Sequence, residues 1–198
     1  MKNILFSGNV KVFDGMLTCM LSIFKRTKLK EPYNFYIFTM DVSHIKPDYI
    51  PVSDKQVEFL QQIARDYNPD NLVTKIDVTD IYMEEFDNCP NENAYCSPYT
   101  LLRLFADKIP EIPDKLLYLD VDILFNREPE LLYDVDVEGY EYAAARDHYG
   151  KYLLNPNYIN AGVLLFNMKE IRKTGLFEKA RHLIKTKKLL FADQDAVY

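Results

Sequence analysis

The stretch LLYLDVDILF, residues 116–125, places two aspartates directly after a continuous apolar run. Apolar residues at successive positions are typical of a strand that is buried on both faces of a parallel sheet. We therefore predict such a strand over residues 115–120. Ligands usually bind at the carboxyl ends of the strands in open α/β sheets, so Asp120 and Asp122 are predicted to lie at a ligand-binding edge.

Short apolar runs and helically periodic stretches alternate along the rest of the chain, which is the pattern of an α/β domain. Ser53 and Gln56 form a capping box that begins a helix, and Ser97 with Pro98 begins another that runs through Ala106. Further helices are predicted near 13–24 and 176–187, and further strands at 3–6, 33–39, 72–77, 142–145 and 162–167. No linker or repeat interrupts this pattern, so a single domain over residues 1–198 is expected.

Charge and composition exclude several classes of protein. Thirty acidic against 24 basic residues give a net charge of −6, which argues against a nucleic-acid partner. The three cysteines have no Cys-x-x-Cys spacing and are predicted to be reduced thiols in the cytoplasm. The amino-terminal apolar run is too short for a signal peptide, and none approaches the roughly 20 residues of a membrane span. Any membrane association is expected to be peripheral.

The tripeptide Asp-Val-Asp occurs twice, at 120–122 and at 134–136. In an extended strand, residues i and i+2 point to the same side, so the carboxylates of Asp120 and Asp122 are predicted to project together. Burying both acids among apolar residues would be costly unless a cation neutralised them. Hard oxygen ligands favour Mg²⁺ or Mn²⁺ and a phosphorylated substrate. The alternative is a strand end whose acids cap backbone amides, and the second copy is predicted to be a solvated loop.

Two classes of enzyme have an apolar strand that ends in Asp-x-Asp. In haloacid-dehalogenase-like phosphatases the motif tends to open the domain and is usually followed, after one further residue, by Thr or Val. Here a long segment precedes the motif, and Leu124 stands at that position. A metal-dependent phosphatase is therefore the weaker alternative.

The other class accounts for three motifs in order. LLYLDVDILF (116–125), YINAGVLLFNM (158–168) and FADQDAVY (191–198), with YTLLRL (99–104) upstream, resemble the signature of glycosyltransferase family 8. This family contains retaining, sugar-nucleotide-dependent enzymes. The resemblance covers nearly the whole chain and implies the GT-A fold, an α/β fold with a Rossmann-like, mixed and mostly parallel sheet.

The resemblance also implies a binding site for a UDP-hexose donor, either galactose or glucose. Asp120, Val121 and Asp122 match the Asp-x-Asp motif that binds a divalent ion, usually Mn²⁺ and otherwise Mg²⁺, on the donor diphosphate. Arg103 matches a basic residue near the diphosphate. Tyr99 stands in for an aromatic residue that the family has close to this arginine.

Other donor contacts follow from the same resemblance. Asn160, Ala161 and Gly162 match a turn that lines the donor sugar, and Asp193 matches an acid that binds the hydroxyls of that sugar. Asn9 stands where the family has an acid that pairs with uracil. An asparagine can also hydrogen-bond to a uracil edge.

Gln194 and Asp195 are the candidate catalytic residues, and Asp147 matches a position on the acceptor side. Retention requires either double displacement or front-face attack. An amide is a poor nucleophile, so we predict front-face attack, with the leaving phosphate as proton acceptor and the Gln194 carbonyl dipole stabilising positive charge. Asp195 is the alternative nucleophile.

Family members supply a third metal ligand, a histidine, downstream of the last motif, and this chain ends at Tyr198. His44, His148 and His182 all precede that motif. We therefore expect a catalytic domain truncated at its carboxyl end, with a catalytically inactive sugar-nucleotide-binding protein as the alternative. The expected acceptor is a glycan or glycolipid, as in bacterial lipopolysaccharide biosynthesis, reached from the cytoplasm or from the cytoplasmic membrane face.

Overall fold

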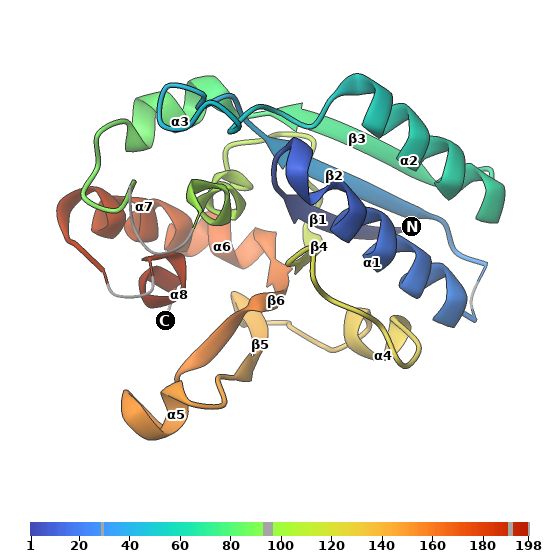
Figure 1. Ribbon diagram of the computed structural model, residues 1–198. Coiled ribbons are helices and arrows are strands. Elements are labelled where there is room, and N and C mark those ends of the chain that lie inside the picture. The colour runs from blue at the N-terminus through green and yellow to red at the C-terminus, as the bar shows by residue number, and fades with distance from the viewer. Residues whose placement is uncertain (29, 93–96, 190–191, 198) are drawn as a thin grey trace.

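The computed structural model describes residues 1–28, 30–92, 97–189 and 192–197. Within these ranges a six-stranded sheet has the order β3-β2-β1-β4-β6-β5, and helices cover both of its faces (Figure 1). The strands are β1 (Lys2–Ser7), β2 (Tyr33–Thr39), β3 (Leu72–Asp77), β4 (Lys115–Leu119), β5 (Tyr142–Arg146) and β6 (Ile159–Asn167).

The direction of the strands gathers several predicted residues at one edge of the sheet. Strands β3, β2, β1 and β4 pair in parallel, whereas β6 is antiparallel to both β4 and β5. The predicted mixed, mostly parallel sheet is therefore confirmed. Strands β1, β4 and β5 end where β6 begins, so Asn9, Asp120, Asp147 and Asn160 all fall at this edge.

Helices pack on the two faces of the sheet. On one face lie α1 (Phe13–Arg26) and α2 (Asp54–Tyr67); the other is covered by α3 (Thr79–Phe86), the 3-10 helix η2 (Pro98–Phe105), α6 (Met168–Thr174) and α7 (Leu176–Thr186). Shorter helices are η1 (Val10–Val12), α4 (Glu130–Tyr133), α5 (Gly150–Leu153) and α8 (Ala192–Val197).

Alternate residues of the strands enter two separate cores. In β1, Ile4 and Phe6 pack with α1 and α2, whereas Leu5 packs with η2 and α7 on the opposite face. Successive side chains of a strand point to opposite faces, which is why strands that are apolar at every position belong at the centre of this sheet. Burying one such side chain fully stabilises the fold by about 1.5–3 kcal/mol.

Local sequence signals account for several helix ends. The capping box of α2 is present as predicted, because Ser53 accepts a hydrogen bond from the backbone of Gln56 and the Gln56 side chain accepts one from the backbone of Ser53. Ser97 caps η2 and Pro98 begins it, again as predicted, but this segment is a 3-10 helix. The predicted helix at 176–187 is α7. Helices α3 to α6 were not predicted, since they are too short to show a clear period.

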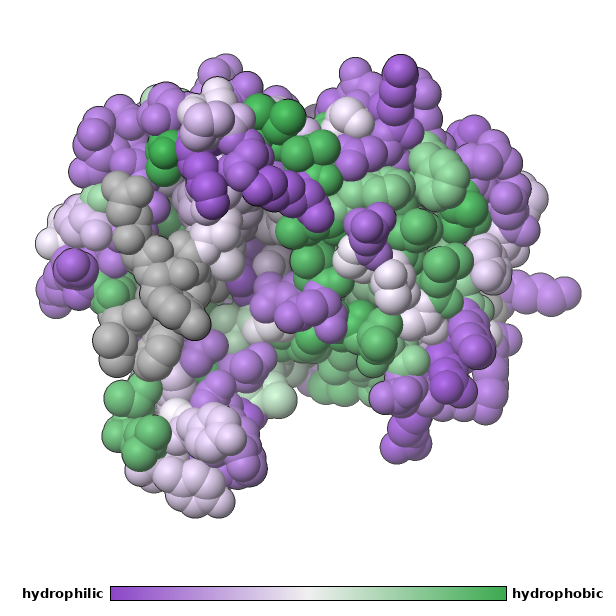
Figure 2. Space-filling model, viewed as in Figure 1, coloured by the Kyte–Doolittle hydropathy of each residue, from purple (hydrophilic) through white to green (hydrophobic). Residues whose placement is uncertain are grey.

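A tip formed by β5, β6 and α5 extends away from the rest of the molecule (Figure 1). Tyr149, Tyr152 and Leu153, in and directly before α5, have exposed side chains, and Figure 2 shows hydrophobic surface at the end of this tip. None of the described helices is long and apolar enough to cross a membrane.

Candidate active site

A pocket of about 360 Å³ opens at the edge where β1 and β4 end. Its lining includes Asn9 after β1, Tyr49 from the segment between β2 and α2, Tyr99 from η2, and residues 120–122 after β4. The two acids and the asparagine that were predicted from separate motifs therefore share one pocket with the aromatic rings of Tyr49, Tyr99 and Tyr118.

Of the two acids, Asp120 makes more contacts with its neighbours. Its Oδ1 accepts a 2.7 Å hydrogen bond from the Tyr118 hydroxyl and lies 3.4 Å from Nη2 of Arg103. Its backbone N–H donates to the carbonyl of Gly162 at 2.8 Å. A Cβ at Gly162 would stand only 2.8 Å from Asp120 Oδ2, so the absence of a side chain there leaves room for this oxygen.

Asp122 is exposed. The expectation that apolar neighbours bury both acids, so that a cation must neutralise them, was therefore wrong for Asp122. Strand β4 ends at Leu119 and residues 121–122 form a turn, which brings the acids to the mouth of the pocket instead of extending the strand. Within the described residues Asp122 makes no hydrogen bond or ion pair. A neutralising ion is thus not required by burial, but two carboxylates on one pocket provide the hard oxygen donors that Mg²⁺ and Mn²⁺ prefer.

The second Asp-Val-Asp is exposed, as predicted, and takes no part in this pocket. Asp134 pairs with Lys2 at 2.6 Å, and Asp136 accepts a 2.9 Å hydrogen bond from the backbone of Glu138. These contacts are those of an ordinary surface loop.

Arg103 is not a surface arginine, since only 2% of it is exposed. Its Nε donates to the carbonyl of Thr100 at 2.9 Å, and its Nη1 donates to the carbonyl of Ala161. The guanidinium carbon also lies 3.8 Å from the centre of the Tyr118 ring. Arg103 therefore joins η2, β4 and β6 and orients Asp120.

Asn160, Ala161 and Gly162 lie within strand β6, so the expected turn at these residues is corrected. Strand β6 continues through these residues because it pairs with β5 at Ile159 and with β4 from Val163 onward, and between these points the Gly162 carbonyl accepts a hydrogen bond from the backbone of Asp120. Asn160 Oδ1 accepts a hydrogen bond from the backbone of Gly162 at 3.0 Å. Its Nδ2 donates to Asp147 at 3.4 Å.

Asp147 joins this group from the end of β5. Its Oδ1 accepts hydrogen bonds from the backbone N–H groups of Tyr149 at 3.0 Å and Gly150 at 2.6 Å. The bond from Gly150, with help from Asn160, lowers the pKa of Asp147 below its ordinary value. The position predicted on the acceptor side is therefore a structured carboxylate and not a solvated loop residue.

Gln194 and Asp195 approach from α8. The Gln194 Oε1 accepts a 3.2 Å hydrogen bond from the backbone of Ala161, and Asp195 accepts one from the Tyr158 hydroxyl. Burial, together with Asp195, raises the pKa of Tyr158, which keeps this hydroxyl protonated. Gln194 and Asp147 line a second cavity of about 420 Å³ beneath α5. The side chain of Asp193 lies outside the part of the chain that the structure describes.

Asn9 and Tyr99 also line the first pocket. Asn9 is buried, and its Oδ1 caps η1 by accepting a 3.1 Å hydrogen bond from the backbone of Lys11. The Tyr99 hydroxyl donates to the Met40 carbonyl at 3.0 Å, and its ring meets that of Tyr49 edge-on at 5.6 Å. Burial raises the pKa of Tyr99, so it too remains a neutral hydroxyl.

Sequence reasoning did not identify several of the residues that line the pocket, among them Ser7, Tyr49 and Tyr118. The Ser7 Oγ is buried and has no hydrogen-bond partner among the described residues. Its place at the end of an apolar strand, like that of Asp120, was the signal that could have identified it.

Comparisons with known proteins agree with this geometry. The family described as Glycosyl transferase family 8 matches residues 3–198. A putative glycosyltransferase of Haemophilus influenzae is 28% identical over 188 residues, which covers 90% of this chain and 52% of the relative. Glycosyltransferase GlyA of Streptococcus pneumoniae is 34% identical over 109 residues, which covers 49% of this chain and 15% of that protein. The chain thus spans about half the length of the first of these relatives.

Solved structures show the same fold. The galactosyltransferase LgtC in complex with donor and acceptor sugar analogs matches with a TM-score of 0.77 and 20% identity, over 98% of this chain and 69% of LgtC. The bifunctional glycosyltransferase WbbM matches with a TM-score of 0.75 and 19% identity, over 98% of this chain and 36% of WbbM. The expected GT-A fold is confirmed.

Proposed function

The chain belongs to glycosyltransferase family 8, and from this premise we propose that it transfers galactose or glucose from a UDP-sugar to a glycan or glycolipid with retention. The observation that carries the proposal is a chain of contacts between two cavities. Asp120 in the first contacts Arg103, Arg103 contacts the Ala161 carbonyl, and the Ala161 N–H contacts Gln194 in the second. Such a chain would fix the donor phosphate relative to the transferred sugar.

The first pocket suits a nucleoside diphosphate. Tyr49 and Tyr99 offer apolar ring surface to a base. Asn9 and the Ser7 Oγ, which has no partner among the described residues, offer polar contacts. The diphosphate would then lie near Asp120 and Asp122, where negative charges would repel it. Mn²⁺ or Mg²⁺ held by these two carboxylates would neutralise the charge that develops on the leaving diphosphate.

The second cavity suits the transferred sugar and its acceptor. Retention by front-face attack breaks the bond between the anomeric carbon and the phosphate oxygen, and that oxygen keeps the electron pair. The acceptor hydroxyl forms the new bond on the same face, and its proton passes to the departing phosphate oxygen. The Gln194 carbonyl, held by Ala161, would stabilise the positive charge on the sugar.

The contacts of Asp195 favour a role other than nucleophile. The Tyr158 hydroxyl donates to its carboxylate, so an oxygen of this acid is already engaged by a neighbouring side chain. This contact supports front-face attack over a covalent intermediate on Asp195.

The tip of α5 supports a glycan or glycolipid acceptor. Tyr149 and Leu153 line the second cavity and are also exposed at the surface. Aromatic rings offer flat apolar faces with polar edges, which suit the alternating apolar and hydroxylated faces of a sugar. A bacterial surface glycan assembled at the cytoplasmic face of the membrane is the acceptor we propose.

Calorimetric titration with UDP tests the donor site. We expect binding that requires Mn²⁺ and is abolished in Asp120→Asn/Asp122→Asn, while Asp134→Asn/Asp136→Asn, the same change in the exposed copy, binds like the wild type. Equal binding by both double variants would refute the assignment. Metal-dependent binding without hydrolysis or transfer of UDP-galactose or UDP-glucose would support the sugar-nucleotide-binding alternative.

A further inference from the structure

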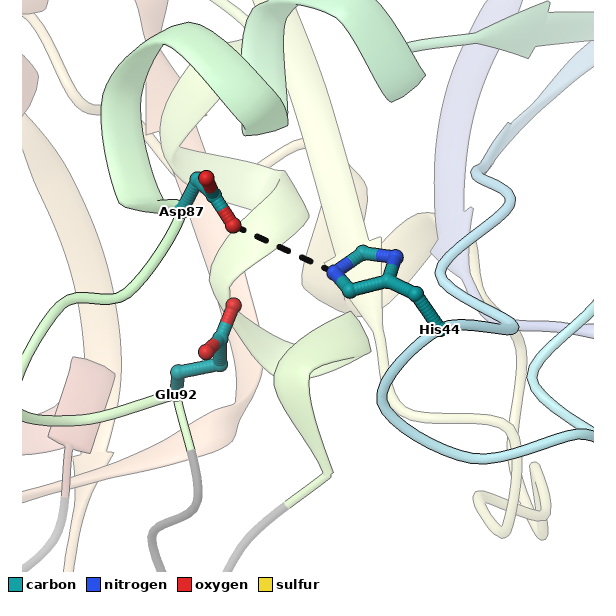
Figure 3. A group of neighbouring side chains, drawn as sticks. All are labelled: His44, Asp87 and Glu92. Carbon is teal, nitrogen blue, oxygen red and sulfur yellow. Dashed lines mark ion pairs between the residues drawn. The ribbon is translucent and has the colours of Figure 1, made fainter.

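His44, Asp87 and Glu92 form a cluster contributed by three separate segments (Figure 3). His44 follows β2, Asp87 caps the end of α3, and Glu92 precedes η2. Each offers one possible ligand atom, and these atoms all lie within 4.8 Å of one another. His44 Nε2 is 3.9 Å from an Asp87 oxygen. None of the three lines the pocket that contains Asp120.

Glu92 supplies an independent observation. It is only 8% exposed, and its Oε1 is buried with no hydrogen-bond partner within the described ranges. In Figure 3 its carboxylate points toward Asp87 and His44. A buried carboxylate without a partner is costly, and the nearby carboxylate of Asp87 adds repulsion, so this arrangement calls for a positive charge between the two acids.

We propose that His44, Asp87 and Glu92 bind a divalent ion of the zinc type at a second site, separate from Asp120 and Asp122. Two carboxylates and a neutral imidazole carry a total charge of −2, which a divalent cation balances. Mixed nitrogen and oxygen ligands suit zinc, whereas the all-oxygen set of Asp120 and Asp122 suits Mg²⁺ or Mn²⁺. A water molecule would complete the tetrahedron.

The cluster needs little adjustment to bind such an ion. Bonds of about 2.0–2.2 Å to a tetrahedral zinc place the ligand atoms roughly 3.3–3.5 Å apart. His44 and Asp87 are exposed and can rotate toward Glu92, which forms the buried base of the site.

An ion here would act on the structure of the donor pocket and not on the reaction. It would tie the segment that carries Tyr49 to Glu92 and to the end of α3. The rings of Tyr49 and Tyr99 pack at 5.6 Å and line the pocket. Bound zinc would therefore restrain the aromatic wall of that pocket.

Zinc titration of the metal-stripped Asp120→Asn/Asp122→Asn protein tests the proposal. The double variant prevents zinc from binding to the Asp120 and Asp122 carboxylates. We expect about one equivalent of zinc to bind and to raise Tm. Adding His44→Asn or Glu92→Gln should weaken zinc binding at least roughly 10–100-fold, the loss that even second-shell changes cause, and should remove the shift in Tm. His182→Asn, which changes an exposed histidine on α7, is the matched control and should bind zinc normally.

Three results would overturn the proposal. One is a folded protein that binds no zinc, and another is zinc affinity that His44→Asn leaves unchanged. The third is zinc binding that disappears in Cys89→Ser but persists in His44→Asn, which would assign the ion to the nearby thiol. Because His44 is exposed, its variant is expected to fold, and circular dichroism checks this.

Discussion

The Arg103 guanidinium lies 3.4 Å from the Asp120 carboxylate, and it is the buried partner of the pair. Its other nitrogens are occupied by the carbonyls of Thr100 and Ala161. Arginine can satisfy three acceptors in fixed directions because its guanidinium is planar and carries five donors. The pair therefore fixes where the acid lies relative to β6.

Arg103→Lys should weaken both stability and metal-dependent UDP binding. Lysine keeps the charge but cannot reach all three acceptors, and each buried carbonyl left without a donor costs on the order of 1–3 kcal/mol. Urea denaturation and UDP titration measure the two effects. Arg181→Lys is the matched control, because Arg181 is also buried and holds Asp107 and the Leu104 carbonyl, and none of these residues lines the pocket. It should lose stability but keep UDP affinity, and equal losses of affinity in both variants would contradict the role of Arg103.

Gly162→Ala should displace Asp120. The new Cβ would stand 2.8 Å from Asp120 Oδ2 and 3.2 Å from Asn160 Oδ1, and overpacking of this kind costs about 1–3 kcal/mol. We expect Mn²⁺-dependent UDP affinity to fall roughly tenfold, equivalent to about 1.4 kcal/mol. Gly139→Ala strains a backbone at φ +77° but meets no atom of the described residues within 4 Å, so it should lower stability without changing affinity. Unchanged affinity in Gly162→Ala would show that Asp120 Oδ2 is not used.

Asn9→Asp should alter the preference for the base. The Asn9 Oδ1 caps η1, and aspartate caps helices as well as asparagine does, so stability should change little. The substitution replaces an amide donor with an acceptor that can pair with the N3–H of uracil. We expect affinity for UDP to rise relative to CDP, measured by calorimetry with Mn²⁺. An unchanged ratio would mean that Asn9 does not contact the base.

Asp147→Asn should lower stability in a pH-dependent way. Hydrogen bonds lower the pKa of Asp147 in the folded protein, and the one from the Gly150 backbone has the largest effect. This carboxylate therefore stabilises the fold fully above its unfolded-state pKa of about 3.9 and loses that contribution as the pH falls through the lower folded-state pKa. Urea denaturation should show a difference from wild type that is constant between pH 5 and 8 and shrinks below about pH 4. If the difference in stability between the variant and wild type persists below about pH 4, the substitution acts through packing or hydrogen-bond geometry and not through the loss of the negative charge.

Strand and helix signals predicted the central sheet because they are local. The apolar runs of β1, β2 and β4 and the capping box at Ser53 depend only on neighbouring residues. Two predictions were wrong, the burial of Asp122 and the turn at Asn160, and both residues lie near the end of a strand. How far a strand extends depends on its pairing with a distant strand, which the local sequence does not show.

The sequence by itself determined the α/β architecture through its periodicity, and the family through the resemblance of motifs in a fixed order. Both signals are local in the chain, so neither needs the directions of side chains in the folded protein. Only the tertiary structure decided that Arg103 is buried against Asp120 and Ala161, that Gly162 leaves room for an Asp120 oxygen, and that His44 meets Asp87 and Glu92. These contacts join residues far apart in the chain, and their geometry depends on how loops close over the sheet.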